Sequence, residues 1–460
     1  MIMKTYKIFK GLSLALVALA TLATTSCKDE PDKYEVAGGK PTIYYIRPVA
    51  YSSRDSLVTQ ASMGTTLCVV GDNLRSVTKM LFNDQSAVLN TSYMTDNTII
   101  VTVPKDIPET ISDKIFFINN AKDTVEYDFH VIIPAPIVSA LSNEWAAAGE
   151  EVTIKGDYFL DYDNAPLTVN FGKEYVLDRS YIRSITRNAI TFTMPADAPH
   201  EKISVTSAYG TTEGAFKYMD DRGMLFDFDT PCATGVVLGN HGWHARTIQS
   251  DDTSLSGNYL VMGDAAMSEE GGWDDGNFSF EYWPGNWRNP ETYEDYPRMC
   301  DIADFTNAES LNLKFEMCIP EDRAWSAAPI QIYFGSTSLV SNGNAGASDI
   351  YGNTLGGANN GFFHEQGKLS RGLYMPWKDT DDLLYHTSGK WQTVTMALSD
   401  FIYDWDGSKL SSSTYLSADD FGAFNIFIVR GGYNDKSVLP EGVACNPLIK
   451  IDNIRVVPNK

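Results

Sequence analysis

The segment Tyr282-Trp283-Pro284-Gly285-Asn286-Trp287 holds the residue types that point most directly to chemistry. Neighbouring residues on a strand point to opposite faces, so Tyr282 and Trp283 are not both expected to be buried in a one-sided sheet. The proline and glycine that follow end the strand, which places Trp287 in a loop. Strand-end aromatic rings can stack on the C–H face of a pyranose, while nearby polar groups bind its hydroxyls. The segment therefore predicts an aromatic platform for a sugar ring.

Tryptophan is concentrated in the same half of the chain. All but one of the nine tryptophans follow Asp220, where the composition changes, and the exception is Trp145. Trp391 lies in an alternating run and is expected to belong to a core rather than to a ligand surface. Burying one aromatic face contributes about 1.5–3 kcal/mol. A few such faces, less ordering costs, predict micromolar to millimolar affinity, which suits a binding protein that acts in many copies.

Acidic residues raise the alternative of a glycosidase. Such an enzyme needs two carboxylates about 5–10 Å apart. Abundance is not a motif, because a chain of net charge -23 has many solvated carboxylates, and the sequence contains no Gly-x-Ser-x-Gly or His-Glu-x-x-His pattern. We therefore expect no catalytic residues, and a surface endo-glycanase is the runner-up. The candidate carboxylates are Asp251, Asp252, Asp274, Asp275, Glu281, Asp379, Asp381 and Asp382.

The net charge and the pattern of acidic residues and cysteines limit which classes of ligand and metal ion are expected. A strongly acidic chain disfavours nucleic acid and anionic polysaccharides, so a neutral ligand is expected. No cofactor or metal is expected, although Asp227, Asp229 and Asp452 leave a structural calcium ion open. The cysteines after Cys27 are irregularly spaced and include no Cys-x-x-Cys pair, which is neither a disulfide framework nor a zinc site. A bridge between Cys300 and Cys318 has only the exported context in its favour.

The N-terminus reads as an export signal. Residues 1–26 run from lysines through an uncharged apolar stretch to small residues, the order found in secretory signal peptides. Cys27 directly after the small residues resembles a bacterial lipobox, in which this cysteine is lipidated. The following Lys28-Asp29-Glu30 resembles the signal that sends some Bacteroidetes lipoproteins to the cell surface. Residues 27–40 are then expected to be the lipidated N-terminus and a flexible linker.

An internal repeat follows, in residues 41–133 and 134–219. In each copy a proline-led strand precedes two glycines seven residues apart, Gly64 and Gly71 in the first and Gly149 and Gly156 in the second. We expect these glycines where the backbone adopts positive φ. Alternating strands with turn signals every 8–12 residues indicate antiparallel sandwiches of immunoglobulin size.

Residues 220–460 are predicted to form one larger all-β sandwich. Strand-like runs recur without a convincing long amphipathic helix, and the period of two is unbroken from Leu311 to Ile319. The stretch from Gly335 to Gly361 lacks the context of a phosphate loop and is read as a long surface loop. The predicted strands are Leu225 to Asp229, Tyr259 to Met262, Phe278 to Trp283, Leu311 to Ile319, Ile330 to Phe334, Trp391 to Leu398, Phe424 to Val429 and Ile449 to Val457.

Two resemblances extend this interpretation. The repeat, with Gly71-Asp72-Asn73-Leu74 in its first copy, resembles IPT/TIG domains, which implies a semi-rigid stalk of two immunoglobulin-like spacers. The last part of the chain is similar to carbohydrate-binding jelly rolls. The whole resembles the second surface glycan-binding protein (SGBP-B type) of Bacteroidetes polysaccharide-utilisation loci, which carries a C-terminal xyloglucan-binding domain.

This resemblance implies specific roles. Tyr282 and Trp283 match the Tyr-Trp pair of the family's platform, and Trp243 is the best upstream tryptophan. It implies a lipoprotein at the outer face of the outer membrane that binds xyloglucan or a related neutral β-glucan without cleaving it. The implied partners are a TonB-dependent transporter with its SusD-like lipoprotein and a surface endo-glycanase of the same locus. An adhesin for host glycoprotein is a third alternative.

Overall fold

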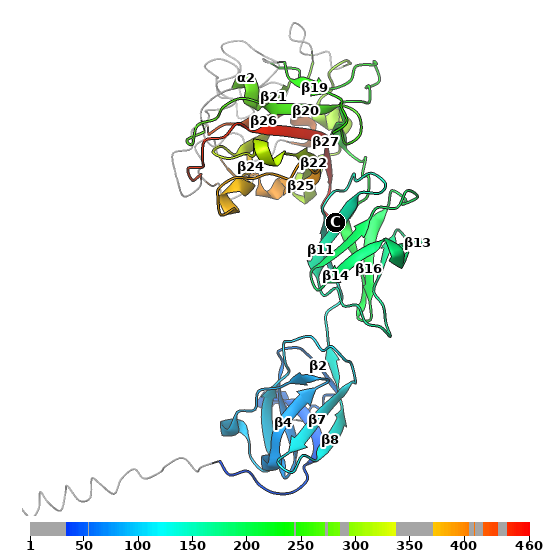
Figure 1. The fold of residues 1–460 in the computed structure, drawn as a ribbon, viewed down its shortest axis with the longest axis vertical. Helices are drawn as coiled ribbons and strands as arrows, with labels where there is room; N and C mark the ends of the chain where they lie inside the picture. The colour runs from blue at the N-terminus through cyan, green and yellow to red at the C-terminus, as the bar shows by residue number, and fades with distance from the viewer. Residues whose placement is uncertain are drawn as a thin grey trace, which may run out of the picture. The chain divides into compact units, whose positions relative to one another are not determined.

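The computed structural model describes residues 34–53, 55–242, 245–271, 275–285, 294–336, 371–403, 409, 417–430 and 439–460. Within them the chain is all-β, which confirms the predicted fold class, and the chain divides into two compact units, 1–134 and 135–460 (Figure 1). None of the helices in these ranges is long and apolar enough to cross a membrane.

The first immunoglobulin-like domain packs three- and four-stranded sheets around one core. Its sheets have the orders β1-β3-β6 and β5-β4-β7-β8, and the short parallel pair β2 and β9 closes one end. Alternation along β7 buries every second side chain, as a one-sided sheet requires. The strands are β1 (Thr42–Pro48), β2 (Gln60–Ser62), β3 (Thr66–Asp72), β4 (Val77–Phe82), β5 (Gln85–Ser86), β6 (Thr98–Thr102), β7 (Lys114–Asn119), β8 (Thr124–Asp128) and β9 (His130–Ile132).

The second immunoglobulin-like domain repeats this plan with two four-stranded sheets. Their orders are β10-β11-β15-β14 and β13-β12-β16-β17, and all neighbouring strands are antiparallel. Phe171, Phe192 and Tyr218 meet edge-on in its core. The strands are β10 (Ile137–Leu141), β11 (Glu151–Asp157), β12 (Thr168–Phe171), β13 (Tyr175–Val176), β14 (Ile182–Thr186), β15 (Ala189–Thr193), β16 (Lys202–Ser207) and β17 (Gly210–Lys217).

The repeated glycines have two different causes. Gly64 and Gly149 adopt positive φ, 78° and 88°, as predicted from the turn argument. Gly71 and Gly156 do not. A Cβ there would lie 2.0 Å and 1.8 Å from the carbonyl oxygens of the first strand of each domain, so close strand contact excludes a side chain. The expectation of positive φ was therefore wrong for the second glycine of each pair.

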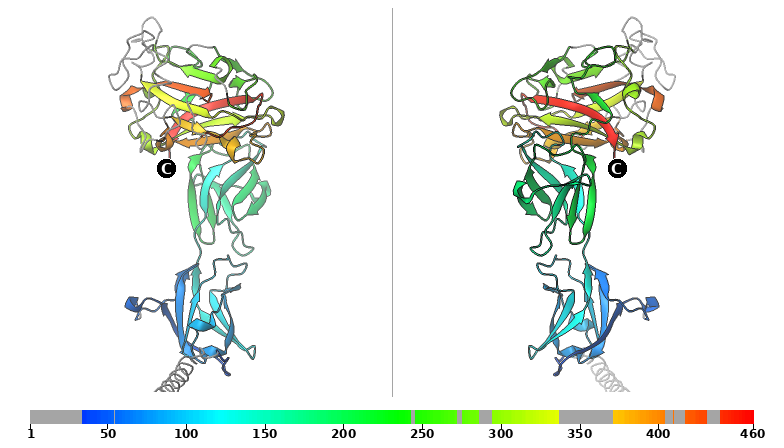
Figure 2. Two further views of the ribbon diagram at one scale, coloured as in Figure 1. Left: turned by 90° about the vertical axis from the view of Figure 1, so that its left-hand side faces the viewer. Right: turned by 90° about the vertical axis from the view of Figure 1, so that its right-hand side faces the viewer.

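The C-terminal domain is a sandwich of two unequal sheets. The larger, here called the β27 sheet, has the order β19-β20-β27-β22-β25, with β18 also paired to β27. The long strand β27, red in Figures 1 and 2, pairs with β18, β20 and β22. Its strands are β18 (Met224–Phe226), β19 (Thr247–Gln249), β20 (Tyr259–Gly263), β22 (Leu311–Cys318), β25 (Gln392–Ala397) and β27 (Leu448–Pro458).

The second sheet, here called the β26 sheet, has the order β21-β26-β23-β24. Every residue of β21 and of β26 is buried, so this sheet is covered on both faces rather than one. That explains why its strands read as nearly continuous apolar runs. The strands are β21 (Ser279–Tyr282), β23 (Ile330–Ser336), β24 (Gly372–Tyr374) and β26 (Phe421–Ile428).

Within the described ranges, helical structure is limited to single turns that connect the strands. The α-helical turns are α2 (Asp275–Phe278) and α3 (Met299–Ile302). The 3-10 turns are η1 (Tyr51–Ser53), η2 (Leu74–Ser76), η3 (Thr91–Tyr93), η4 (Arg179–Tyr181), η5 (Ala308–Ser310), η6 (Glu321–Arg323), η7 (Pro376–Asp379), η8 (Leu398–Asp400) and η9 (Ala418–Asp420).

Two smaller predictions are settled by these strands. Trp391 is buried, packs edge-on against Tyr259 and donates its indole N–H to the Thr253 carbonyl at 2.8 Å, which confirms a core role. Cys300 and Cys318 are both free thiols, so a bridge between them is not formed. Most of the predicted loop from Gly335 to Gly361 lies outside the described residues.

Candidate glycan-binding face

The two faces of the β26 sheet differ in chemistry. Phe226 of the β27 sheet packs against Phe280, Tyr282 and Phe424, so these side chains mark the face that looks into the sandwich. Because side chains alternate along a strand, Glu281 and Asn425 lie on the opposite face. Trp283, one residue beyond β21, continues that alternation on the side of Glu281. We call this side of the β26 sheet the outer face.

Polar residues form a row across the outer face. In the strand register Glu281 is opposite Asn425, and Asn425 is opposite Tyr333, so one residue from each of three neighbouring strands lines up. The Tyr333 ring stacks on Phe427 with ring centroids 5.8 Å apart and planes 12° from parallel. The Arg371 guanidinium lies 5.2 Å from the Tyr333 ring centroid, a cation–π contact. Carboxylate, amide, phenol and guanidinium groups thus share one sheet face.

Asn425 carries a buried donor without a partner among the described residues. It is 1% exposed, and its Nδ2 is buried without a hydrogen-bond partner in the described part of the chain. Leaving a buried donor unsatisfied costs about 1–3 kcal/mol, so such groups require an explanation. Burial also raises the pKa of Tyr333, which keeps its hydroxyl protonated and able to donate. Both side chains are buried, at 1% and 0% exposed, so neither donor lies at the surface of this structure.

A short segment extends the edge of the sheet beside β21. The His241 amide donates to the Glu281 carbonyl at 2.9 Å, and the Trp283 amide donates to the His241 carbonyl at 3.0 Å. His241 Nδ1 donates to the Trp283 carbonyl at 2.6 Å, and its ring stacks on Tyr296 at 3.5 Å. Burial lowers the pKa of His241. The neighbouring Gly242 packs so closely on Glu281 that a Cβ would lie 2.4 Å from the Glu281 Cβ.

Two of the four predicted platform residues, Tyr282 and Trp283, lie within the described part of the chain. Tyr282 is 0% exposed, packs against Phe226 and donates its hydroxyl to the Pro297 carbonyl at 2.6 Å. It is therefore a core residue, and its predicted role as a sugar platform is wrong. Trp283 is also buried, at 7% exposed. The expectation that the pair could not both be buried failed because the β26 sheet is covered on both faces.

The other two predicted aromatics, Trp243 and Trp287, lie outside the described residues. The structure describes only the residues that precede them in the chain. The last described residues before them are Gly242, which packs on Glu281, and Gly285, whose amide donates to the Tyr296 carbonyl at 2.8 Å. The platform role of Trp243 and Trp287 stays a prediction.

The candidate calcium ligands are occupied by protein donors. Asp227 accepts the amides of Asp229 and Thr230, and Asp229 accepts the backbone and side-chain N–H groups of Asn258. Asp452 accepts the Asn453 amide at 2.8 Å. Within the described ranges no group of three or more His, Cys, Asp or Glu side chains is placed to hold a metal ion.

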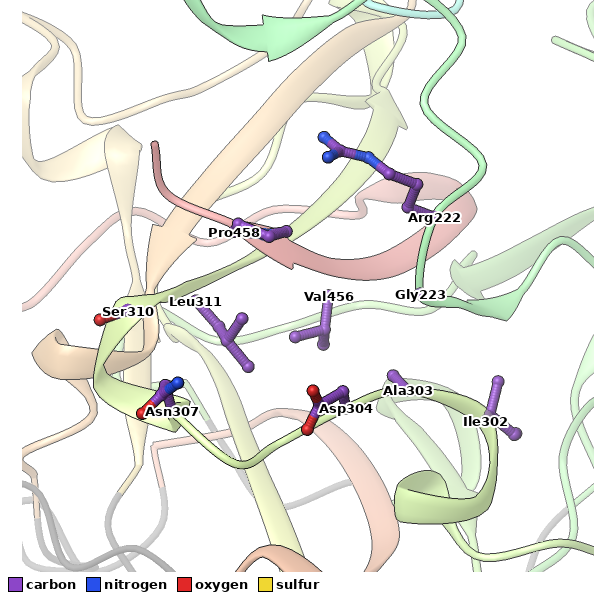
Figure 3. Close-up of a pocket in the computed structure, with 10 residues that line it drawn as sticks. All are labelled: Arg222, Gly223, Ile302, Ala303, Asp304, Asn307, Ser310, Leu311, Val456 and Pro458. Carbon is purple, nitrogen blue, oxygen red and sulfur yellow. The ribbon is translucent and has the colours of Figure 1, made fainter.

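A separate cavity lies below this domain's strands, beside the connection from the second immunoglobulin-like domain (Figure 3). Its volume is about 400 Å³ and its floor is aliphatic, with Leu311 and Val456 opposite the polar Asp304 and Asn307. No aromatic side chain is among its lining residues, so it offers no stacking surface for a sugar. The lining residues are Arg222, Gly223, Ile302, Ala303, Asp304, Asn307, Ser310, Leu311, Val456 and Pro458.

Sequence reasoning missed the polar row apart from Glu281, which it considered only as a carboxylate. Asn425 is the one strongly polar residue in the apolar strand from Phe424 to Val429, and that contrast was the available signal. Tyr333 and Gln331 similarly interrupt β23 at alternate positions. Arg371 had no local signal, because only the pairing of β23 with β24 brings it beside Tyr333.

Comparison with known families assigns this domain. A family model described as the surface glycan-binding protein B xyloglucan binding domain matches residues 218–458. The chain belongs to this family. A second model, the IPT/TIG domain, matches residues 136–218, the second immunoglobulin-like domain. The family membership agrees with the SGBP-B resemblance given above.

This chain is also similar to two individual proteins. The crystal structure of the surface glycan-binding protein PbSGBP-B from Prevotella bryantii is 58% identical, with a TM-score of 0.83, over 92% of this chain and 100% of that one. An IPT/TIG domain-containing protein of Bacteroides ovatus is 27% identical over 216 residues, 43% of this chain. The match covers 42% of that protein's length.

Proposed function

We propose that this protein is a non-catalytic binder of a neutral plant β-glucan, with xyloglucan as the favoured ligand. The single observation that carries the proposal is membership of the xyloglucan-binding domain family, supported by 58% identity to a protein named as a surface glycan-binding protein. We place the binding region at the edge of the β26 sheet around Trp283, and we assign Trp243 and Trp287 to it from the sequence alone. A long neutral chain suits such a site because each sugar adds a modest stacking contribution.

The polar row on the outer face is the second element of this proposal. Asn425, Tyr333, Arg371 and Glu281 are all buried, between 0% and 3% exposed. We therefore assign them a supporting role beneath the binding region, where they fix the strand edge that carries Trp283.

The cell-surface part of the proposal rests on the N-terminal sequence. Lipidation of Cys27 after removal of residues 1–26 would anchor the protein in the outer membrane. The anchored protein would hold glycan near a TonB-dependent transporter and its SusD-like lipoprotein, with a surface endo-glycanase supplying fragments. These partners come from the family resemblance.

The decisive experiment measures binding and cleavage together. Native affinity electrophoresis and calorimetry are run against xyloglucan, mixed-linkage β-glucan, an unrelated α-glucan and a host mucin glycoprotein. Incubation mixtures are then analysed for released oligosaccharides. Retardation by xyloglucan without released sugars is the expected result. Released oligosaccharides would establish the endo-glycanase alternative, and retardation by mucin alone would establish the adhesin.

The site is tested with aromatic variants. Trp243→Ala and Trp287→Ala are each expected to weaken xyloglucan binding at least tenfold. Tyr51→Ala, which removes an exposed tyrosine of the first immunoglobulin-like domain, serves as the matched control and should bind normally. Circular dichroism establishes that each variant is folded. If both tryptophan variants bind as tightly as the control, the platform lies elsewhere.

A further inference from the structure

A cluster of four buried charges lies between the second immunoglobulin-like domain and the C-terminal domain. Glu144 comes from the former, and Lys314, Glu316 and Arg455 come from β22 and β27 of the latter. Their exposed fractions are 2%, 4%, 0% and 0%. All four residues belong to the single compact unit formed by residues 135–460.

The four side chains form one connected network. The Arg455 guanidinium donates to Glu316 Oε2 at 2.7 Å and to Glu144 Oε2 at 2.9 Å. Lys314 Nζ donates to the other Glu144 oxygen at 2.5 Å. Glu144 therefore meets both cations, and the cluster of two acids and two bases is neutral. Arg455 also lies over the Trp145 ring, 5.9 Å from its centroid.

Backbone contacts fix the same loop to a third strand. The Glu144 amide donates to Thr393 Oγ1 at 2.7 Å, and that hydroxyl donates to Glu316 Oε1 at 3.0 Å. The Thr393 amide donates to the Ser142 carbonyl at 2.9 Å. The loop that carries Glu144 is thus bonded to β25 as well as to the charges of β22 and β27.

We expect this network to fix the relative orientation of the two domains more than it strengthens their association. Removing charges from water is costly, and mutual attraction offsets that cost only when the geometry is good and all partners are present. A tilt or slide of one domain on the other would leave a buried charge without its partner. Because Glu144 is on one domain and both cations are on the other, the network tolerates one relative placement.

We propose that the second immunoglobulin-like domain and the C-terminal domain act as one rigid body whose orientation is set by the Glu144–Lys314–Glu316–Arg455 cluster. This immunoglobulin-like domain is then a fixed base for the C-terminal domain and not an independent spacer. The short connection between β17 and β18, in which Asp220 pairs with Arg222, is consistent with this role. The proposal concerns orientation and does not depend on which ligand is bound.

The test compares distance distributions between the two domains. Spin labels on non-canonical amino acids replace the exposed Val176 and Val237, which leaves the native cysteines untouched. Pulsed electron resonance on the full chain is expected to give one narrow distance peak. Glu144→Gln should broaden that peak at least twofold. The matched control is Glu213→Gln, which removes a carboxylate from the exposed Lys202 pair of the same domain and should leave the peak unchanged.

Two further variants keep the proposal testable if Glu144→Gln does not fold. In Glu144→Gln with Lys314→Met the cluster regains neutrality, so the peak should narrow again. Thr393→Val keeps the side-chain shape but removes the bridging hydroxyl, and it should broaden the peak even if Glu144→Gln does not fold. A broad peak in the wild-type chain would overturn the proposal. An unchanged narrow peak in all folded cluster variants would overturn it as well.

Discussion

The Trp283 amide and the His241 carbonyl are joined by a 3.0 Å hydrogen bond, and His241 Nδ1 returns a 2.6 Å bond to the Trp283 carbonyl. These two bonds tie the segment before Trp243 to the strand end that carries Trp283. The described segment that ends at Gly242 is therefore anchored to the edge of the β26 sheet beside Trp283. The first predictions test this anchoring.

Gly242→Ala should weaken glycan binding without unfolding the protein. The added Cβ would lie 2.4 Å from the Glu281 Cβ and 2.7 Å from its Oε2, so the segment must move away from the sheet. Overpacking of this kind costs about 1–3 kcal/mol. Calorimetry with xyloglucan measures the loss. Gly239→Ala is the matched control, because nothing lies within 4 Å of its added Cβ. Equal affinity of the two variants would contradict the prediction.

Acidification should loosen the same edge. Burial lowers the pKa of His241 below its unfolded value of about 6.5. The unfolded chain then binds the proton more readily than the folded one, so stability contributed by neutral His241 is lost as pH falls through and below this value. Thermal unfolding from pH 8 to 5 should show this loss. His241→Gln should flatten the profile, and an unchanged profile would contradict the prediction.

Tyr282→Phe separates a core role from a ligand role. The change keeps the ring against Phe226 and removes the hydroxyl that bonds to the Pro297 carbonyl. Stability should fall by about 1 kcal/mol, the typical contribution of one buried hydrogen bond. Affinity for xyloglucan should be unchanged in calorimetry. A loss of affinity without a loss of stability would restore Tyr282 to the ligand surface.

Asp452→Asn should change the pH dependence of stability. Burial is the main cause that raises the pKa of Asp452 to about 8. A raised pKa gives stability that is complete below the unfolded value of about 3.9 and is lost as pH rises through about 8. The neutral asparagine lacks this loss. In urea denaturation, the free energy of unfolding of Asp452→Asn should therefore rise relative to that of the wild type between pH 5 and pH 9. A difference in free energy that does not change with pH would contradict the raised pKa of Asp452.

Cys27→Ala tests the anchor. Without the thiol no lipid can be attached at this position, so the protein should move from the membrane fraction to the soluble fraction. Cys232→Ala removes another cysteine and should not alter fractionation. Membrane retention of the Cys27 variant, shown by immunoblotting of separated fractions, would exclude lipidation at this residue as the anchor.

Periodicity predicted the architecture because it depends on local burial. Leu313, Phe315 and Met317 alternate with residues of the other face in β22, and the structure places them in the sandwich core. The same reasoning failed for Tyr282 and Trp283. Alternation tells which residues share a face, but whether both faces are covered depends on segments far away in the sequence.

The candidate site was only partly predictable for the same reason. A strand-end tryptophan is a local signal, so the sequence singled out the region around Trp283, whose role in binding stays a prediction. The row of Glu281, Asn425 and Tyr333 exists only after three strands pair in a particular register. Arg455 was likewise unremarkable in sequence, because its partner Glu144 is 311 positions away.

The buried charges at Glu144 also limit how this protein can exchange parts in evolution. A recombination event at residue 220 would separate Glu144 from Arg455 and leave mismatched charges on both products. A crossover at Pro134 would cut between the two compact units and spare the cluster. Grafts that carry residues 135–460 together should therefore be inherited more readily than the C-terminal domain alone.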